Sequence, residues 1–145
     1  MAISVKKAAL WRGETANRPG ALADVLAPLA AAGADLKVVM GYVVPGQPAN
    51  GVIEVYPVTT KKAAAAAGRA GLAAAATPCL VVEGDNRPGL GHAMAQSLAG
   101  SGINLSFVVA QVVGRKYAAL FGFESDADAA KATKLLKSAG AKRGK

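Results

Sequence analysis

The sequence is poor in the residues that build most catalytic and metal sites, with one cysteine and one histidine in 145 residues. Cys79 has no second thiol with which to form a disulfide, and together with His92 it is too small a ligand set for a metal ion. A single histidine also leaves no credible Ser-His-acid or Cys-His centre. The glycines at 89–91 lack the lysine or the third glycine of nucleotide-binding loops. We therefore expect no enzyme activity, no cofactor and no metal.

Long apolar runs are missing as well. A membrane-spanning helix needs about 20 apolar residues, whereas the richest stretch, 63–76, is mostly alanine and is interrupted by glycine and arginine. No uninterrupted apolar segment follows Lys6 and Lys7, so we expect no secretory leader. The lone thiol suits a reducing compartment. We predict a cytoplasmic protein with no membrane partner.

Aromatic residues make up only 5% of the chain, although its formal net charge is +8. The lysines and arginines are scattered or lie in the C-terminal tail, and few rings are present to stack on nucleic-acid bases. This distribution favours solvated faces over a nucleic-acid site. Weak nucleic-acid binding through the tail, residues 141–145, is an alternative that predicts salt-sensitive binding.

What the sequence does contain is a repeat. Asn-Arg-Pro-Gly occurs at 17–20 and again at 86–89, each time after a short apolar run and before an apolar pattern of helical spacing. A repeat separated by almost half the chain indicates a structural unit. The hydrophobic fraction of 52% predicts packed cores. Because a half-chain alone buries a marginal core, we expect the halves to pack on each other or on a second chain.

Each copy predicts the order strand, helix, strand, strand, helix. In the first copy the expected elements are a strand at 8–14, a helix from Pro19 to about Ala32, strands at 36–44 and 52–56 around a turn at 45–51, and a helix at 59–70. Leu22, Val25, Leu26 and Leu29 should form the apolar face of the first helix, whereas Pro28 should bend it. In the second copy the strands are expected at 79–83, 105–109 and 117–123, with a helix through 90–98 and another at 126–139 that Ser125 caps.

This order, completed by one more strand, is the ferredoxin-like βαββαβ unit. We predict an α+β fold of two such units, residues 3–76 and 77–145, packed side by side as one extended antiparallel sheet with helices on one face. The last strand of each unit is not evident, because only 72–76 is available in the first copy and the tail has no strand character. Either these edge strands are very short or residues 3–5 substitute for one of them.

These residues resemble the ACT domain, a small ligand-binding module. The second copy has an apolar strand at 80–83, the turn at 86–89 and then Gly102-Ile103-Asn104-Leu105; the first has the turn at 17–20 and Gly33-Ala34-Asp35-Leu36 at the same offset. The resemblance covers roughly residues 5–139. It implies a stand-alone tandem regulatory protein that senses a free amino acid, forms a homodimer and acts on an enzyme or other protein.

The resemblance also implies where a ligand binds. In the regulatory domain of D-3-phosphoglycerate dehydrogenase, the effector lies between paired domains and is held by the turn asparagine and by the asparagine that opens the second strand. Those roles carry onto Asn86 with Asn104, and onto Asn17 with Asp35. The expected ligand-binding residues are Asn86, Pro88, Gly89, Leu90 and Asn104 in the second copy, and Asn17, Pro19, Gly20, Ala21 and Asp35 in the first.

The chemistry of the turn suits such a ligand. A helix start offers unpaired N–H groups to a carboxylate, a bare glycine lets the ligand approach, and an asparagine can both donate and accept. An acid such as Asp35 or Asp85 is a candidate partner for the ammonium group. In the alternative hypothesis the asparagines bond only their own backbone, and the protein is a structural or protein-interaction module. Gly84 and Thr15, which stand where that dehydrogenase has a histidine, favour this alternative.

Overall fold

The computed structural model describes residues 3–141 and divides the chain into two compact units. The inserted unit is Ala9–Ala76, and the flanking unit combines the N-terminal residues through Ala8 with the chain from Thr77 onward. The divisions fall between residues 8 and 9 and between residues 76 and 77. The N-terminal residues 3–8 differ from the expectation, because they belong to the unit of the second repeat and not to that of the first. The basic tail beyond residue 141 lies outside the described residues.

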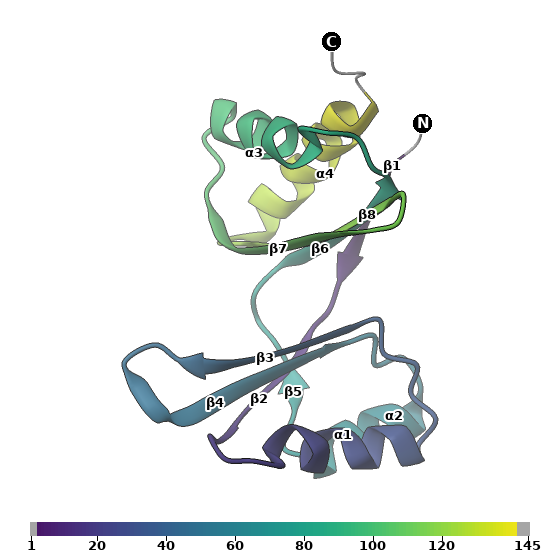
Figure 1. Ribbon diagram of the computed structural model, residues 1–145, viewed down its shortest axis with the longest axis vertical. Helices are drawn as coiled ribbons and strands as arrows, with labels where there is room; N and C mark the ends of the chain where they lie inside the picture. Colours follow the sequence, from purple (N-terminus) through teal and green to yellow (C-terminus); the bar gives the residue numbers. More distant parts are fainter. Residues whose placement is uncertain (1–2, 142–145) are drawn as a thin grey trace. The chain divides into compact units, whose positions relative to one another are not determined.

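The inserted unit contains six elements in the ferredoxin-like order (Figure 1). They are β2 (Trp11–Ala16), α1 (Ala21–Ala31), β3 (Val38–Val44), β4 (Gln47–Tyr56), α2 (Lys61–Arg69) and β5 (Ala73–Ala74). The sheet has the strand order β3-β4-β2-β5, and every neighbouring pair is antiparallel. The last strand of this unit is thus very short, because it pairs through only two alanines.

The flanking unit contains the equivalent elements with its last strand taken from the start of the chain. They are β1 (Ile3–Ala8), β6 (Cys79–Asp85), α3 (Leu90–Gly100), β7 (Leu105–Val113), β8 (Lys116–Phe123) and α4 (Asp126–Ala141). The strand order β1-β6-β8-β7 is the same as that of the inserted unit. β1 pairs with β6 over its whole length, from Ile3 opposite Gly84 to Ala8 opposite Cys79. Both sequence-based alternatives for the last strand therefore hold, one in each unit.

The strands form two four-stranded sheets over the described residues, not the single extended sheet that we expected. In each unit the two helices cover one face of the sheet (Figure 1). The core of the flanking unit packs Leu80, Val82, Met94, Phe123 and Leu136 between sheet and helices. The core of the inserted unit is smaller and uses alanine, since Ala66 and Ala67 of α2 are fully buried beside Val55. No helix within residues 3–141 has the length and apolar character needed to span a bilayer.

Helix ends and one hairpin show where local sequence rules succeed and fail. Ser125 accepts a hydrogen bond from the Asp128 amide at 3.1 Å, so the predicted cap of α4 is confirmed. α1 continues past Pro28, and of its predicted apolar face Leu29 is buried whereas Leu22 is exposed. The predicted turn at 45–51 is wrong, because β4 already begins at Gln47. Pro48 is tolerated there because the ladder with β3 is irregular at this point, so no ladder bond is lost.

The position of β1 can be tested through Gly140 of α4. A Cβ on Gly140 would lie 2.3 Å from Cγ1 of Ile3, so there is no room for a side chain while β1 is in place. We expect Gly140→Ala to lower the free energy of unfolding by about 1 kcal/mol or more. Gly68→Ala in α2 is the matched control, because nothing lies within 4 Å of its Cβ and alanine favours a helix by up to ~1 kcal/mol. Urea unfolding measures both, and equal stability of the two variants would contradict the packing of β1 on α4.

Candidate functional site

Both Asn-Arg-Pro-Gly turns deliver the chain into a helix whose first amides have no side-chain cap. Gly20 and Gly89 are the N-caps of α1 and α3, with φ of 86° and 82°, and no side chain accepts a hydrogen bond from either helix start. Only glycine adopts such positive φ values without strain. The two glycines are also exposed. The first amide of each helix donates to the carbonyl of the turn arginine at 3.2 Å, Ala21 to Arg18 and Leu90 to Arg87. Each turn therefore presents the N–H groups that follow, and the positive end of a helix, to an approaching anion.

The turn asparagines make the same backbone bond in both units. The Asn17 amide donates to the Ala49 carbonyl at 2.9 Å, and the Asn86 amide donates to the Arg115 carbonyl at 2.8 Å. In each case the acceptor belongs to the β-hairpin that follows the first helix of the unit. These bonds attach the first turn to β4 and the second turn to the tip of the β7–β8 hairpin.

The side chains of the two asparagines differ. Nδ2 of Asn17 donates to the Pro48 carbonyl at 2.8 Å, whereas the exposed side chain of Asn86 makes no hydrogen bond among residues 3–141. The reason is the length of the hairpins. The pairing of β4 with β2 stops at Asn50, but β4 begins three residues earlier, at Gln47. This extra length places Pro48 beside Asn17. In the flanking unit β8 begins only at Lys116, the last residue that pairs with β6, so Gly114, the counterpart of Pro48, lies in the hairpin turn and accepts no bond from the Asn86 side chain.

The polar residues that open the second strands also differ. Asp35 forms an exposed ion pair with Lys37, with 2.7 Å between Oδ2 and Nζ. Nδ2 of Asn104 lies 3.4 Å from Oε2 of Glu124, which is a long and weak contact on the surface. Asn104 is therefore nearly free to bond a ligand, whereas Asp35 already has a cation beside it.

Asn86 and Asn104 are not brought together within one unit. Asn86 lies before the start of α3 and Asn104 lies just beyond its end, and α3 has 11 residues. At 1.5 Å per residue the helix is about 16 Å long. The ammonium and carboxylate groups of one amino acid are only a few ångströms apart, so one unit cannot hold both ends of the ligand with these two asparagines.

The remaining predicted residues offer a ligand few side-chain polar groups. Pro19 and Pro88 are exposed, while the side chains of Ala21 and Leu90 are buried in their units and can offer only main-chain groups. His92 is exposed on α3. Asp85 is already paired with Lys116, whose hydrogen bond and charge lower the pKa of the Asp85 carboxyl. Within the described residues no three His, Cys, Asp or Glu side chains gather as a metal site.

The two turn arginines were not expected to matter, yet they make different contacts. Arg18 pairs with Asp24 at 2.6 Å and donates to the Pro19 carbonyl at 3.1 Å, so both contacts stay within its own turn and helix. Arg87 donates from Nη2 to the Ala139 carbonyl at 2.8 Å, 52 residues away. Identical tetrapeptides gave no sequence signal for this difference.

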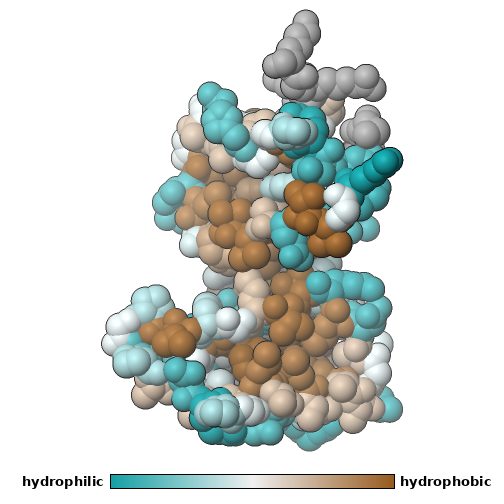
Figure 2. Space-filling view, in the orientation of Figure 1, coloured by the Kyte–Doolittle hydropathy of each residue, from teal (hydrophilic) through white to brown (hydrophobic). Residues whose placement is uncertain are grey.

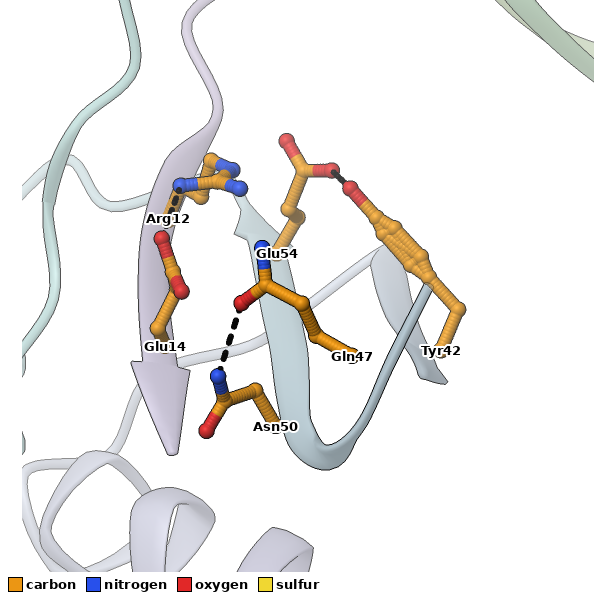
Figure 3. Close-up of polar contacts among 6 residues, drawn as sticks. All are labelled: Arg12, Glu14, Tyr42, Gln47, Asn50 and Glu54. Carbon is orange, nitrogen blue, oxygen red and sulfur yellow. Dashed lines mark hydrogen bonds and ion pairs between the residues drawn. The ribbon is translucent and has the colours of Figure 1, made fainter. Parts of the chain in front are cut away.

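A second polar cluster lies on the inserted sheet and was also missed (Figure 3). Glu54 of β4 is the buried charged residue of the described chain, at 5% exposure. The Tyr42 hydroxyl donates to it at 2.8 Å. Burial first, and then the Glu54 carboxylate, raise the pKa of Tyr42, while Arg12 on β2 opposes that shift. Strand pairing places Arg12 opposite Glu54, and Arg12 forms its ion pair with Glu14, with 3.6 Å between Nη1 and Oε2.

Apolar side chains also reach the surface of both units (Figure 2). Most of the large exposed ones lie on β3 and β7, the edge strands of the two sheets. Four of them are on β7: Val108, Val109, Val112 and Val113. It carries no charged residue from Leu105 to Val113, so it lacks the lysines and prolines that commonly protect an open edge.

Comparison with solved structures shows what this arrangement is similar to. The regulatory subunit of aspartate kinase from Thermus thermophilus, in a ligand-free form, superposes with a TM-score of 0.63 at 17% identity, over 96% of this chain and 97% of that one. The chain has a tandem ACT fold. Protein BT0572 from Bacteroides thetaiotaomicron matches this ACT fold with a TM-score of 0.68 at 16% identity, over 91% and 88% of the two chains. No protein-family model and no curated protein matches the sequence.

The different uses of the two turn asparagines predict different effects of their removal. Asn17→Ala should lower the free energy of unfolding by about 1 kcal/mol, because the bond to the Pro48 carbonyl is lost. Asn86→Ala should change it by less than about 0.5 kcal/mol, because its side chain has no partner in the described part of the chain. Chemical denaturation of the two variants checks this, and an equal loss in both would contradict the assignment.

Proposed function

We propose that this tandem ACT protein is a non-catalytic regulatory protein that binds a free amino acid at the Asn86 turn of the flanking unit. The observation that carries the proposal is the side-chain amide of Asn86, which has no partner within the described residues and lies beside a helix start without a side-chain cap. The helix start receives the carboxylate, and the C=O and NH2 groups of the Asn86 side chain bond the zwitterion.

The two turns are not equivalent in this proposal. In the inserted unit the Asn17 side chain donates to the Pro48 carbonyl, and the Asp35 carboxylate accepts from Lys37. The equivalent atoms of Asn86 and Asn104 are unbonded or weakly bonded. The flanking unit therefore carries the ligand, and the turn of the inserted unit has a structural role.

A second copy of the chain supplies the other half of the site. β7 starts directly after Asn104 and ends at the hairpin whose Arg115 carbonyl binds the Asn86 amide. Antiparallel pairing of two β7 strands sets the start of one against the end of the other. The partner's Asn104 then comes to the Asn86 end of the first copy. The pairing also covers the exposed valines of β7 and gives a two-fold dimer with two identical sites.

The likeness to known structures supports a regulatory role. Two of the similar chains are described as regulatory subunits of aspartate kinase, from Thermus thermophilus and Thermus flavus. The match covers 97% of each of these chains. In the proposal the present protein likewise acts on another polypeptide, and the bound amino acid sets the strength of that interaction.

Ligand binding can be tested by thermal shift with each common amino acid at millimolar concentration. A ligand at about 100 times its dissociation constant adds ~2.7 kcal/mol to stability, which is a readily measured shift. We expect one or a few amino acids to shift the wild type, and Asn86→Ala and Asn104→Ala to lose the shift while staying folded. Asn17→Ala is the matched control and should keep it. No shift with any amino acid would contradict the proposal and would favour a protein-interaction module.

The same two variants test whether the site is shared between copies. Each two-fold site takes Asn86 from one copy and Asn104 from the other, so a mixed dimer of the two variants has one intact site and one without either asparagine. Co-expression gives about half mixed dimers, and about a quarter of all sites should bind again. Isothermal titration of the purified mixed dimer measures this. A mixed dimer without any binding would contradict a shared site.

The role of the β7 edge in the dimer can be tested separately. Val112→Lys places a charge on the edge strand and should shift the protein from dimer to monomer in sedimentation velocity. Leu22→Lys is the matched control, because Leu22 is similarly exposed, at 42% against 49%, but lies on α1. A dimer that survives Val112→Lys, or that Leu22→Lys disrupts equally, would contradict pairing through β7.

A further inference from the structure

Arg87 connects the second turn to the C-terminal end of α4. Its Nη2 donates to the carbonyl of Ala139, two residues before the end of α4 at Ala141. The last four carbonyls of a helix have no partner within the helix. A guanidinium both bonds such a carbonyl and places a positive charge at the negative end of the helix dipole. Arg87 therefore acts as the C-terminal cap of α4.

The end of α4 is in turn packed on β1. Ala139 and Gly140 are buried, and Gly140 leaves the space that Ile3 fills. Ile3 pairs with Gly84, two residues before Asn86. Three segments thus meet around the second turn: the start of β1, the last turn of α4, and the end of β6 that leads into Asn86. Each is held by contacts with the next.

The first turn lacks this connection. Arg18 bonds Asp24 and the Pro19 carbonyl, both within the turn and the helix that follows it. Both side chains of that ion pair are more than half exposed, at 51% and 67%. An exposed local pair of this kind contributes little to stability. The chain thus contains one turn tied to the rest of its unit by its arginine and one that is not.

We propose that Arg87 is a positioning residue that couples the Asn86 turn to the C-terminal end of α4. Movement of the turn is transmitted to the last turn of α4 and to β1, and order at the end of α4 holds the turn in its binding conformation. This inference rests on the proposed function for its ligand-dependent part. Binding at the turn then protects the end of α4, and by reciprocity an ordered end of α4 favours binding.

Hydrogen exchange tests the coupling first without any ligand. Arg87→Gln should raise exchange about ten-fold or more both at residues 136–141 and at the turn and first helical residues, 86–93, because a charged hydrogen bond is lost. Arg87→Lys, which keeps the charge and a donor, should restore part of the protection. Arg18→Gln is the matched control and should leave both segments unchanged. Unchanged exchange at either segment in Arg87→Gln would overturn the coupling.

The second arm adds a mixture of the common amino acids at about 1 mM each. In the wild type we expect a thermal shift and slower exchange at residues 136–141. Arg87→Gln should keep a reduced thermal shift but lose the added protection of the helix end, a result that a merely structural arginine would not give. Persistent ligand protection of 136–141 in Arg87→Gln would overturn the proposal. A wild type without any shift would contradict amino-acid binding, while the ligand-free arm still decides the coupling.

Discussion

The pairing of β1 with β6 is the interaction on which the rest of the flanking unit depends. Without β1, β6 would be an open edge and the last turn of α4 would have no surface on which to pack. The pairing joins the first strand of the described chain to a strand near its middle, and the whole inserted unit lies between them in sequence. The flanking sheet can therefore be completed only after a long loop is closed, which costs chain entropy. The inserted unit can form from contiguous residues and so needs no such closure.

The two units also differ in strand pairing and in the side chains of their cores. The flanking unit pairs β1 with β6 over six positions and fills its core with large side chains such as Phe123, Met94 and Leu136. The inserted unit ends in a two-residue strand and relies on buried alanines. Alanine buries little apolar area, so each contact contributes less. A site that must keep its geometry is better supported in the flanking unit, where Asn86 is.

Local patterns in the sequence predicted most helices and strands, but they did not predict which distant strands pair. The helices, most strands and the Ser125 cap follow from apolar spacing and capping chemistry, which act over a few residues. The choice of β1 as the last strand could not be made, because residues 3–5 carry no mark of the partner strand they will join. The length of the β3–β4 hairpin was misjudged for a related reason. Pro48 and its polar neighbours predict a turn unless the irregular ladder is known.

At the candidate site, too, the local sequence does not determine the long-range contacts. Two identical tetrapeptides predict equivalent sites, and the backbone bonds of Asn17 and Asn86 are indeed equivalent. Their side chains diverge because Nδ2 of Asn17 bonds the carbonyl of Pro48 within β4, whereas the counterpart Gly114 lies in the turn of the shorter β7–β8 hairpin and makes no such bond. A difference of a few residues in hairpin length thus determines whether the side-chain amide of the turn asparagine bonds the protein or stays available to a ligand. Since the free amide lies about one helix length from Asn104, the features that make the flanking unit suited to binding also make it incomplete alone. In the proposed dimer, binding and association of two copies are a single equilibrium, and a ligand that bridges the copies would stabilise the dimer as it stabilises the fold.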